Sequence, residues 1–266
     1  MTKTIFVTGV TDVFGAAIAR SLADVGHTVY VGCPQTSEVS APAVGATDEV
    51  IGTDATGLRT VPFAPIDQRS VSAAVRSVEA EAGPIDVVIH TVMPVTLGPV
   101  ESFTAYQLGQ LYDACVLSAQ RVNRAVLPRM RERREGLLIW TASPAEPGPG
   151  AFLGPGHALR AAQGRLAEAY AAELAPLGID VTVLAYGRAS GETGGPAASV
   201  HAADTDTAAS YRPEMTGPLR HGEEHGTSAA PVAEQAAAAV ARVVAAPQGT
   251  RPVYLVVGPS VPRQHT

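Results

Sequence analysis

Short apolar runs rich in β-branched residues alternate along the chain with longer stretches in which apolar positions recur every three or four residues. The short runs cover residues 4–8, 27–32, 59–63, 85–91, 136–142, 179–186 and 252–258. The longer stretches cover residues 15–25, 67–82, 101–133, 151–176 and 230–246. Runs that are apolar on both faces are typical of buried parallel strands, and the longer stretches are typical of helices. The pattern predicts one α/β domain over residues 1–266: a Rossmann-type, doubly wound parallel sheet of about seven strands flanked by helices.

Two segments interrupt this alternation. Residues 34–58 are rich in Ser, Thr, Ala and Gly, and residues 188–229 are polar and glycine-rich. The second segment follows the carboxyl end of a predicted strand, where sheets of this kind bind their ligands. We interpret residues 188–229 as a substrate lid, with a disordered loop as the alternative. The histidines in this segment lack the spacing of a metal site, so no metal is predicted.

The composition argues against several classes of protein. The chain has 19 Lys and Arg against 25 Asp and Glu, a net charge of −6, which speaks against nucleic-acid binding. No apolar stretch approaches the roughly 18 residues of a membrane-spanning helix, and the first apolar run is too short for a signal peptide. Cys33 and Cys115 lie far apart, without zinc-site or disulfide spacing. The sequence therefore predicts a cytoplasmic protein with neither membrane nor nucleic-acid partners.

A glycine-containing turn joins the first predicted strand to the first helix and reads TGVTDVFGAAIA, residues 8–19. Such a turn lets backbone N–H groups at the helix start approach a pyrophosphate. With the strand order, the run LAEAYAAELAPLGIDVTVLAYG at 166–187 and AVLPRM at 125–130, the chain resembles the short-chain dehydrogenase/reductase family over nearly its whole length. The resemblance implies a dinucleotide site at Gly9 and Gly15, with His90 in place of an Asn of the nicotinamide pocket.

The chain departs from the family's pattern at the cofactor positions. Val13 replaces the middle glycine of the first turn, and its branched side chain is expected to crowd the diphosphate. Residues 32–34 offer neither the Asp nor the Arg that the family uses for the ribose. Pro65 replaces the adenine-contacting Asp, and Cys115 replaces the Asn of the proton relay. We therefore expect no nicotinamide cofactor, and NAD(P) enters only under the alternative of a divergent reductase.

The family's catalytic serine, tyrosine and lysine align with Ser143, Gly156 and Arg160. In the family the tyrosine hydroxyl delivers a proton, the lysine lowers the pKa of that hydroxyl, and the serine binds the substrate oxygen. Gly156 carries no phenol, and a guanidinium cannot act as a general base. Ser143 and Arg160 are interpreted as binders of an oxyanion or a leaving anion. The alternatives are a strand-end cap for Ser143 and, for Arg160, an ion pair or cover for apolar surface.

The halohydrin dehalogenases share this fold, keep the serine and carry an arginine at the lysine position and a bulky residue in the first turn. Arg160 and the pair Val13–Phe14 resemble that arrangement, but those enzymes retain the tyrosine. A base in this chain would have to be His157, His90 or Tyr186. The alternatives are a surface or capping residue for His157 and a pocket wall for Tyr186.

Three functions remain open from the sequence. The favoured one is an enzyme that performs non-redox polar chemistry on a small organic substrate: elimination, cyclisation, or halohydrin or epoxide chemistry. The second is a catalytically silent subunit paired with an active family member, and the third is a divergent NAD(P)-dependent ketoreductase. The resemblance implies a homodimer or homotetramer, or a hetero-oligomer for the silent subunit, formed through residues 101–133 and 151–176. An alanine-rich face would permit that packing: Ala158, Ala162, Ala169 and Ala172.

Overall fold

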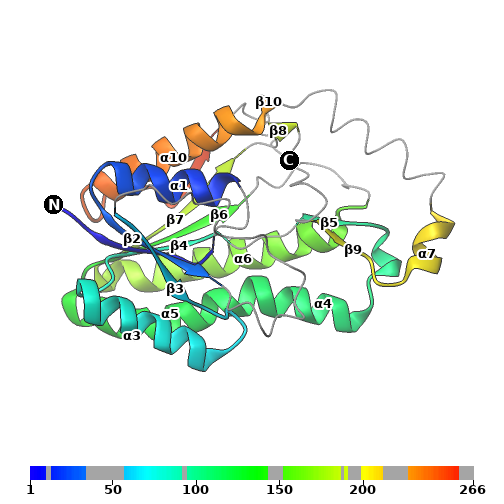
Figure 1. Ribbon diagram of the computed structural model, residues 1–266, viewed down its shortest axis with the longest axis horizontal. Helices are drawn as coiled ribbons and strands as arrows, with labels where there is room; N and C mark the ends of the chain where they lie inside the picture. Colours follow the sequence, from blue (N-terminus) through cyan, green and yellow to red (C-terminus); the bar gives the residue numbers. More distant parts are fainter. Residues whose placement is uncertain are drawn as a thin grey trace.

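The computed structural model describes residues 1–9, 13–33, 57–91, 95–142, 152–186, 189–190, 199–211 and 227–257. Its central sheet has seven parallel strands in the order β11-β7-β6-β4-β1-β2-β3 (Figure 1). The strands are β1 (Thr4–Val7), β2 (Thr28–Cys33), β3 (Leu58–Pro62), β4 (Val87–His90), β6 (Gly136–Ala142), β7 (Ile179–Tyr186) and β11 (Tyr254–Val257). The predicted α/β fold with a doubly wound sheet is confirmed.

Helices cover both faces of this sheet (Figure 1). One layer contains α1 (Val13–Asp24) and α10 (Ala229–Ala245), and the other contains α3 (Gln68–Ala82), α5 (Ser118–Arg133) and α6 (Gly154–Leu174). Along β4, Val87 and Ile89 belong to the core beneath α1 and α10, whereas Val88 belongs to the core on the other face. This alternation follows from the two-residue period of a strand, and it buries β4 on both faces.

The stretch expected as one helix over 101–133 is divided in the structure. It contains the 3-10 turn η1 (Val100–Ser102), the helix α4 (Ala105–Tyr112), the π-helical segment η2 (Asp113–Leu117) and then α5. The Thr104 side chain accepts a hydrogen bond from Gln107 N at 3.1 Å and so begins α4 as an N-cap. Inside η2, the carbonyl of Cys115 accepts a hydrogen bond from Gln163 Nε2 of α6 at 2.8 Å. The π-helical segment therefore holds α6 beside α5.

A small lobe outside the central sheet contains part of the segment 188–229. Strand β5 (Val95–Leu97) pairs in parallel with β9 (Ser199–His201), and α7 (Thr205–Ser210) follows β9. The side-chain amide of Gln107 donates to the His201 carbonyl at 2.7 Å and accepts from Ala203 N at 2.9 Å. Farther along, β8 (Ala189–Ser190) pairs with β10 (Thr227–Ser228). The part of the segment around β9 and α7 thus packs against β5 and α4, and the role of residues 188–229 as a substrate lid stays a prediction.

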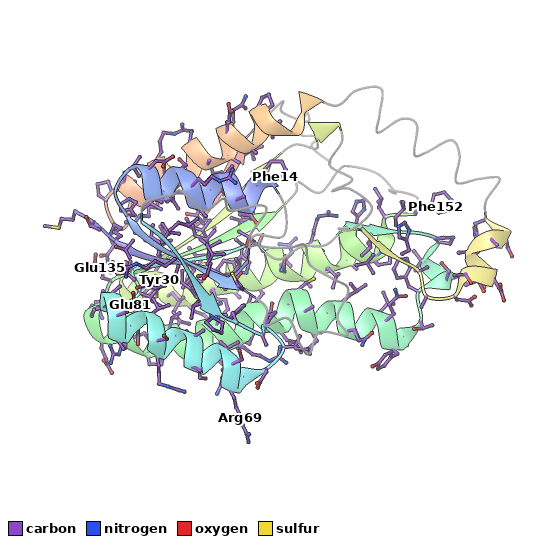
Figure 2. All side chains as sticks on the ribbon, in the orientation of Figure 1. Phe14, Tyr30, Arg69, Glu81, Glu135 and Phe152 are labelled. Carbon is purple, nitrogen blue, oxygen red and sulfur yellow. The ribbon has the colours of Figure 1, made fainter. Side chains whose placement is uncertain are left out.

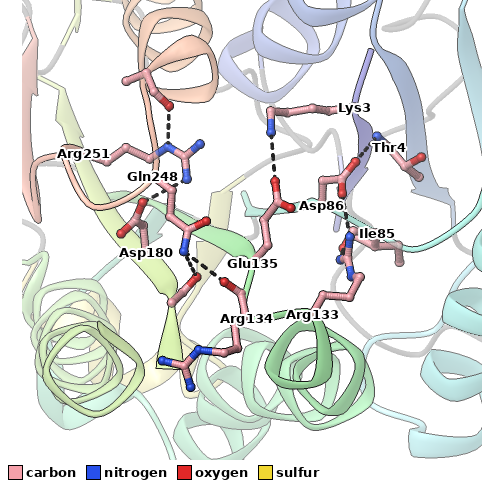
Figure 3. Close-up of polar contacts among 12 residues, drawn as sticks. Lys3, Thr4, Ile85, Asp86, Arg133, Arg134, Glu135, Asp180, Gln248 and Arg251 are labelled. Carbon is pink, nitrogen blue, oxygen red and sulfur yellow. Dashed lines mark hydrogen bonds and ion pairs between the residues drawn. The ribbon is translucent and has the colours of Figure 1, made fainter. Parts of the chain in front are cut away.

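Charged residues join the strands at the amino edge of the sheet, opposite the carboxyl edge (Figure 3). Asp86 accepts hydrogen bonds from Thr4 N and from Arg133 Nη1, both at 2.9 Å. Arg251 forms an ion pair with Asp180 at 2.9 Å, and their side chains are only 5% and 13% exposed. These contacts fix the chain at one edge of the sheet. Within the described ranges, no helix combines the length and apolar character needed to cross a membrane.

Candidate functional site

The strand order reverses between β1 and β4, which are neighbours in the sheet. From β1 the chain continues to β2 and β3 on one side, and from β4 it continues to β6 and β7 on the other. The carboxyl ends of two such strands border a crevice where open α/β sheets bind ligands. Thr91, directly after β4, donates through its backbone N to Thr8 Oγ1 at 3.4 Å and through Oγ1 to the Gly9 carbonyl. These bonds fix the start of the glycine-containing turn beside β4.

Phe14 lies in the first turn of α1 (Figure 2). Its side chain is 2% exposed and belongs to the core between the sheet and the layer of α1 and α10. Gly15 follows it in α1, and the side chain of Val13 lies outside the described residues. The bulky aromatic residue of this turn is therefore part of the core.

His90, at the end of β4, is buried beneath α5. Its Nε2 lies 2.9 Å from Asn123 Oδ1 of α5, and its ring packs on Trp140 with the ring centroids 4.7 Å apart. Burial lowers the pKa of His90 to about 4, which the hydrogen bond with Asn123 only partly opposes. The imidazole is therefore neutral at physiological pH and donates to Asn123 from Nε2. The structure places His90 in the core, and a contact between His90 and a nucleotide stays a prediction.

The helix α6 begins with two glycines that lie directly against the lobe. A Cβ atom on Gly154 would lie 2.6 Å from Val100 Cγ2, and one on Gly156 would lie 2.8 Å from Thr96 Oγ1. Phe152, just before the helix, has a φ of 68°, and its carbonyl accepts a hydrogen bond from Gly98 N at 2.9 Å (Figure 2). The absence of side chains at both glycines lets β5 and η1 approach the helix closely. Thr96 therefore fills the space beside position 156.

Arg160 lies one helical turn after Gly156, on the same side of α6. Its Nη1 would be 3.3 Å from a Cβ atom on Gly156, so the guanidinium shares with Thr96 the space next to that glycine. Arg160 also acts on Cys115, because its charge lowers the pKa of that thiol. Burial has the larger effect and raises the pKa of Cys115 to about 12. Cys115 is therefore an uncharged thiol and not a nucleophile.

The remaining predicted site residues do not all join this group. His157 is half-buried, and its backbone N donates to the Leu153 carbonyl in the first turn of α6. Ser143 lies outside the described residues. Tyr186 ends β7 opposite Val257, and its side chain lies outside the described part as well. The catalytic assignments of these three residues stay predictions.

Thr96 is the member of the group that the sequence did not indicate. Its only signal is a position a few residues after the fourth predicted strand. The contact with Gly156 joins residues 60 positions apart, and it depends on how β5 packs on α6. A sequence pattern does not encode such a contact.

A model of the short chain dehydrogenase family matches residues 3–197 of the chain. The chain belongs to the short-chain dehydrogenase family. It is 32% identical over 184 residues, 68% of each chain, to a putative ketoacyl reductase of the monensin polyketide synthase from Streptomyces virginiae. It is 28% identical over 190 residues to the ketoacyl reductase HetN of a Nostoc species. That match covers 71% of this chain and 64% of HetN, so the chain spans less than two thirds of that relative.

Solved structures of short-chain dehydrogenases share the fold of this family member over nearly its whole length. A short-chain dehydrogenase from Streptomyces avermitilis has a TM-score of 0.77 at 26% identity and covers 97% of this chain and 88% of its own. A metagenomic short-chain oxidoreductase, solved in complex with NADP, has a TM-score of 0.69 at 18% identity, with 97% and 98% covered. The second likeness shows the fold alone.

These relatives correct two expectations drawn from the sequence. Non-redox chemistry as the favoured function is wrong, because the similar short-chain dehydrogenases are named as ketoacyl reductases. The expectation of no nicotinamide cofactor is also contradicted, because the chain belongs to the short-chain dehydrogenase family and a short-chain oxidoreductase of this fold was solved with NADP bound. A residue that departs from a family motif does not by itself remove the site to which the motif belongs. Phe14 illustrates this, since its bulky side chain is buried and belongs to the core.

Proposed function

We propose that this chain is a nicotinamide-dependent reductase that acts on a ketone of an acyl-chain substrate. The observation that carries the proposal is the 32% identity, over 68% of each chain, to a relative named as a putative ketoacyl reductase. An acetoacetyl-CoA reductase from Paracoccus denitrificans, 26% identical over 140 residues, is named for the same type of reaction. A shared fold alone would not support a reaction, so the proposal rests on the sequence relatives that are named as ketoacyl or acetoacetyl-CoA reductases.

The arrangement at the strand reversal fits a dinucleotide. The pyrophosphate would lie at the amino end of α1, next to Gly9 and Gly15, where the helix dipole favours negative charge. Thr8 and Thr91 would hold the turn in place through their hydrogen bonds. Because Phe14 is buried in the core, its side chain does not compete for this position. When bound, the nicotinamide supplies a hydride to the carbonyl carbon.

The family's usual proton donor is missing at Gly156, and Arg160 cannot replace it. A guanidinium has no acceptor and stays charged in proteins, so it stabilises negative charge but does not transfer a proton. The proposed reductase therefore needs other groups at the substrate oxygen. Ser143 remains the candidate from the sequence for one of them.

Nucleotide binding tests this proposal directly. The purified protein is titrated with NADPH and with NADH while the fluorescence of the reduced nicotinamide is followed, and turnover is measured with acetoacetyl-CoA. We expect one nucleotide to bind and to be oxidised only when the ketone is present. Gly15→Val should abolish binding, whereas the matched change Gly164→Val in α6 should leave it intact.

The outcomes separate the open functions. If neither nucleotide binds to the folded protein, the proposal is wrong. If a nucleotide binds but no ketone is reduced, even with a range of β-ketoacyl thioesters, the chain is the silent subunit and not a reductase.

We also propose that copies of the chain associate through α5 and α6. In support, Ala158, Ala169 and Ala172 are exposed along α6, where small side chains permit close approach of a second helix. A hollow of about 470 Å³ lies between the two helices, with Leu127 and Tyr170 among its lining residues. Sedimentation velocity should therefore show a dimer or tetramer, and Ala169→Glu should shift it toward monomer.

A further inference from the structure

Arg121 of α5 joins the turn after β3 to the π-helical segment η2. Its Nη2 donates to Asp113 Oδ1 at 2.5 Å, and its Nη1 donates to the Pro65 carbonyl at 3.4 Å. Asp113 is the first residue of η2, and Pro65 belongs to the turn. A guanidinium carries a fixed fork of donors, so this one side chain can bridge a carboxylate and a carbonyl. The Arg121 side chain is only 20% exposed, which limits its competition with water.

The turn itself, residues 64–67, otherwise depends on local hydrogen bonds. Ala64 N donates to Ser70 Oγ of α3 at 2.8 Å, and Asp67 N donates to the Ala64 carbonyl at 3.1 Å. Asp67 also caps the start of α3. Of the hydrogen bonds that residues 64–67 make within the described part of the chain, only that from Arg121 comes from outside the turn and α3. Arg121 is therefore the link that ties this turn to the helix layer.

The place of the turn in the fold suggests what it is held for. A dinucleotide extends across the strand reversal, and its adenosine ribose lies at the carboxyl end of the second strand, β2. β3 pairs in parallel with β2 on the side away from β1. The turn follows the carboxyl end of β3, so it borders the adenosine half of a dinucleotide bound in the crevice. The hydride would be transferred at the other half, on the side of β4.

We propose that Arg121 is a positioning residue for the adenosine half of the dinucleotide. The inference rests on the proposed function as a nicotinamide-dependent reductase. Arg121 acts through the turn, because its bond to the Pro65 carbonyl keeps residues 64–67 in one conformation before the nucleotide binds. A binding surface that is already ordered avoids the free-energy cost of ordering it on binding. Loss of the bridge should therefore weaken nucleotide binding without slowing hydride transfer.

Arg121→Met removes the bridge and keeps the aliphatic part of the side chain. The Kd of the reduced nucleotide that the wild-type protein binds, NADPH or NADH, should rise about tenfold, the low end of what one hydrogen bond to a charged group contributes. The KM for this nucleotide should rise by the same factor, and kcat at saturating nucleotide should not change. As an inhibitor, ADP should lose affinity for the variant because it carries the adenosine half alone. Nicotinamide mononucleotide should not.

Arg133→Met is the matched control, because Arg133 makes the same kind of bridge near the other end of α5. It donates to Asp86 Oδ1 at 2.9 Å and to the Ile85 carbonyl at 2.8 Å (Figure 3). Its side chain is 28% exposed, and its partners precede β4 at the amino edge of the sheet, away from the crevice. Both variants should lower the Tm, but only Arg121→Met should change the Kd. A merely structural role for Arg121 would affect nucleotide binding equally in the two variants.

Asp113 provides a second check, since it holds the guanidinium from the side of η2. Asp113→Ala should also raise the Kd of the nucleotide. It should add little in an Arg121→Met background, because the two side chains act through one bridge. Independent and additive effects would contradict the proposed order of contacts.

Hydrogen exchange of the nucleotide-free protein tests the turn directly. The Asp67 amide, which donates to the Ala64 carbonyl, should exchange about tenfold faster in Arg121→Met than in the wild-type protein. Its exchange in Arg133→Met should match the wild-type rate. An unchanged rate in Arg121→Met would show that the bridge does not hold the turn and would overturn the inference.

The measurements distinguish failure of this inference from failure of the proposed function. A wild-type Kd in Arg121→Met, or equal losses in Arg121→Met and Arg133→Met, would overturn the inference and leave the reductase intact. A folded wild-type protein that binds neither NADPH nor NADH would overturn the proposed function, and the inference with it.

Discussion

Alanine at Gly156 and alanine at Gly164 should have opposite effects on stability, although both glycines lie in α6. A Cβ atom on Gly164 would meet nothing within 4 Å, so Gly164→Ala should raise the free energy of unfolding by about 1 kcal/mol through helix propensity. At Gly156 the added Cβ would lie 2.8 Å from Thr96 Oγ1, and overpacking of this kind costs about 1–3 kcal/mol. After the gain in propensity, Gly156→Ala should be destabilising by roughly 0–2 kcal/mol.

Urea unfolding at neutral pH measures both variants against the wild-type protein. The contact itself is tested by Gly156→Ala in a Thr96→Ala background, where the opposing atoms are gone. The two substitutions should then couple by about 1–3 kcal/mol, because the alanine at 156 no longer meets Thr96. If Gly156→Ala stabilises the protein as much as Gly164→Ala does, β5 does not pack on α6 as described.

Two further predictions concern groups away from this contact. The pKa of His90 is lowered from 6.5 to about 4 by burial, so the unfolded chain binds a proton in this window that the folded chain does not. Stability should therefore be full above pH 6.5 and fall by up to about 3 kcal/mol as the pH decreases to 4. Urea unfolding of His90→Asn should lack this decrease, and an unchanged pH profile would contradict the argument. Arg251→Met should lower the free energy of unfolding by about 3–5 kcal/mol, because it leaves the buried Asp180 carboxylate without a cation, with only the hydrogen bond from Gly249 N. Arg165→Met, at the exposed pair with Glu168, should cause no measurable change, and equal losses in the two variants would refute this ranking.

The departures of the chain from its family's motifs are visible in the sequence, but their consequences are not. Phe14 is bulky in a turn that must admit a phosphate, and whether it blocks that turn depends on the direction of its side chain. The ring is buried in the core beneath α1 and α10. His90 is a comparable case, because its place at a strand end suggested a functional group and its ring lies against Asn123 and Trp140.

The sequence by itself determined the fold class and the succession of strands and helices along the chain. Periods of two and of three to four residues follow from local backbone geometry, and buried parallel strands must be apolar on both faces. The match of spacing also determined the family. Local patterns did not predict the small strands β5 and β9, because three-residue strands carry too little periodicity.

Only the tertiary structure decided what stands in the tyrosine's place. In the sequence, Gly156 indicates only that the phenol of the family's tyrosine is lost. In the fold, Gly156 is the point at which α6 lies closest to Thr96, with the Arg160 guanidinium beside it. This contact requires β5 to pack on the first turn of α6. The hydrogen bond from Gly98 N to the Phe152 carbonyl holds the end of β5 next to the start of α6. Contacts between residues distant in the chain arise from packing of whole elements, and packing is a property of three-dimensional shape that no local residue pattern specifies.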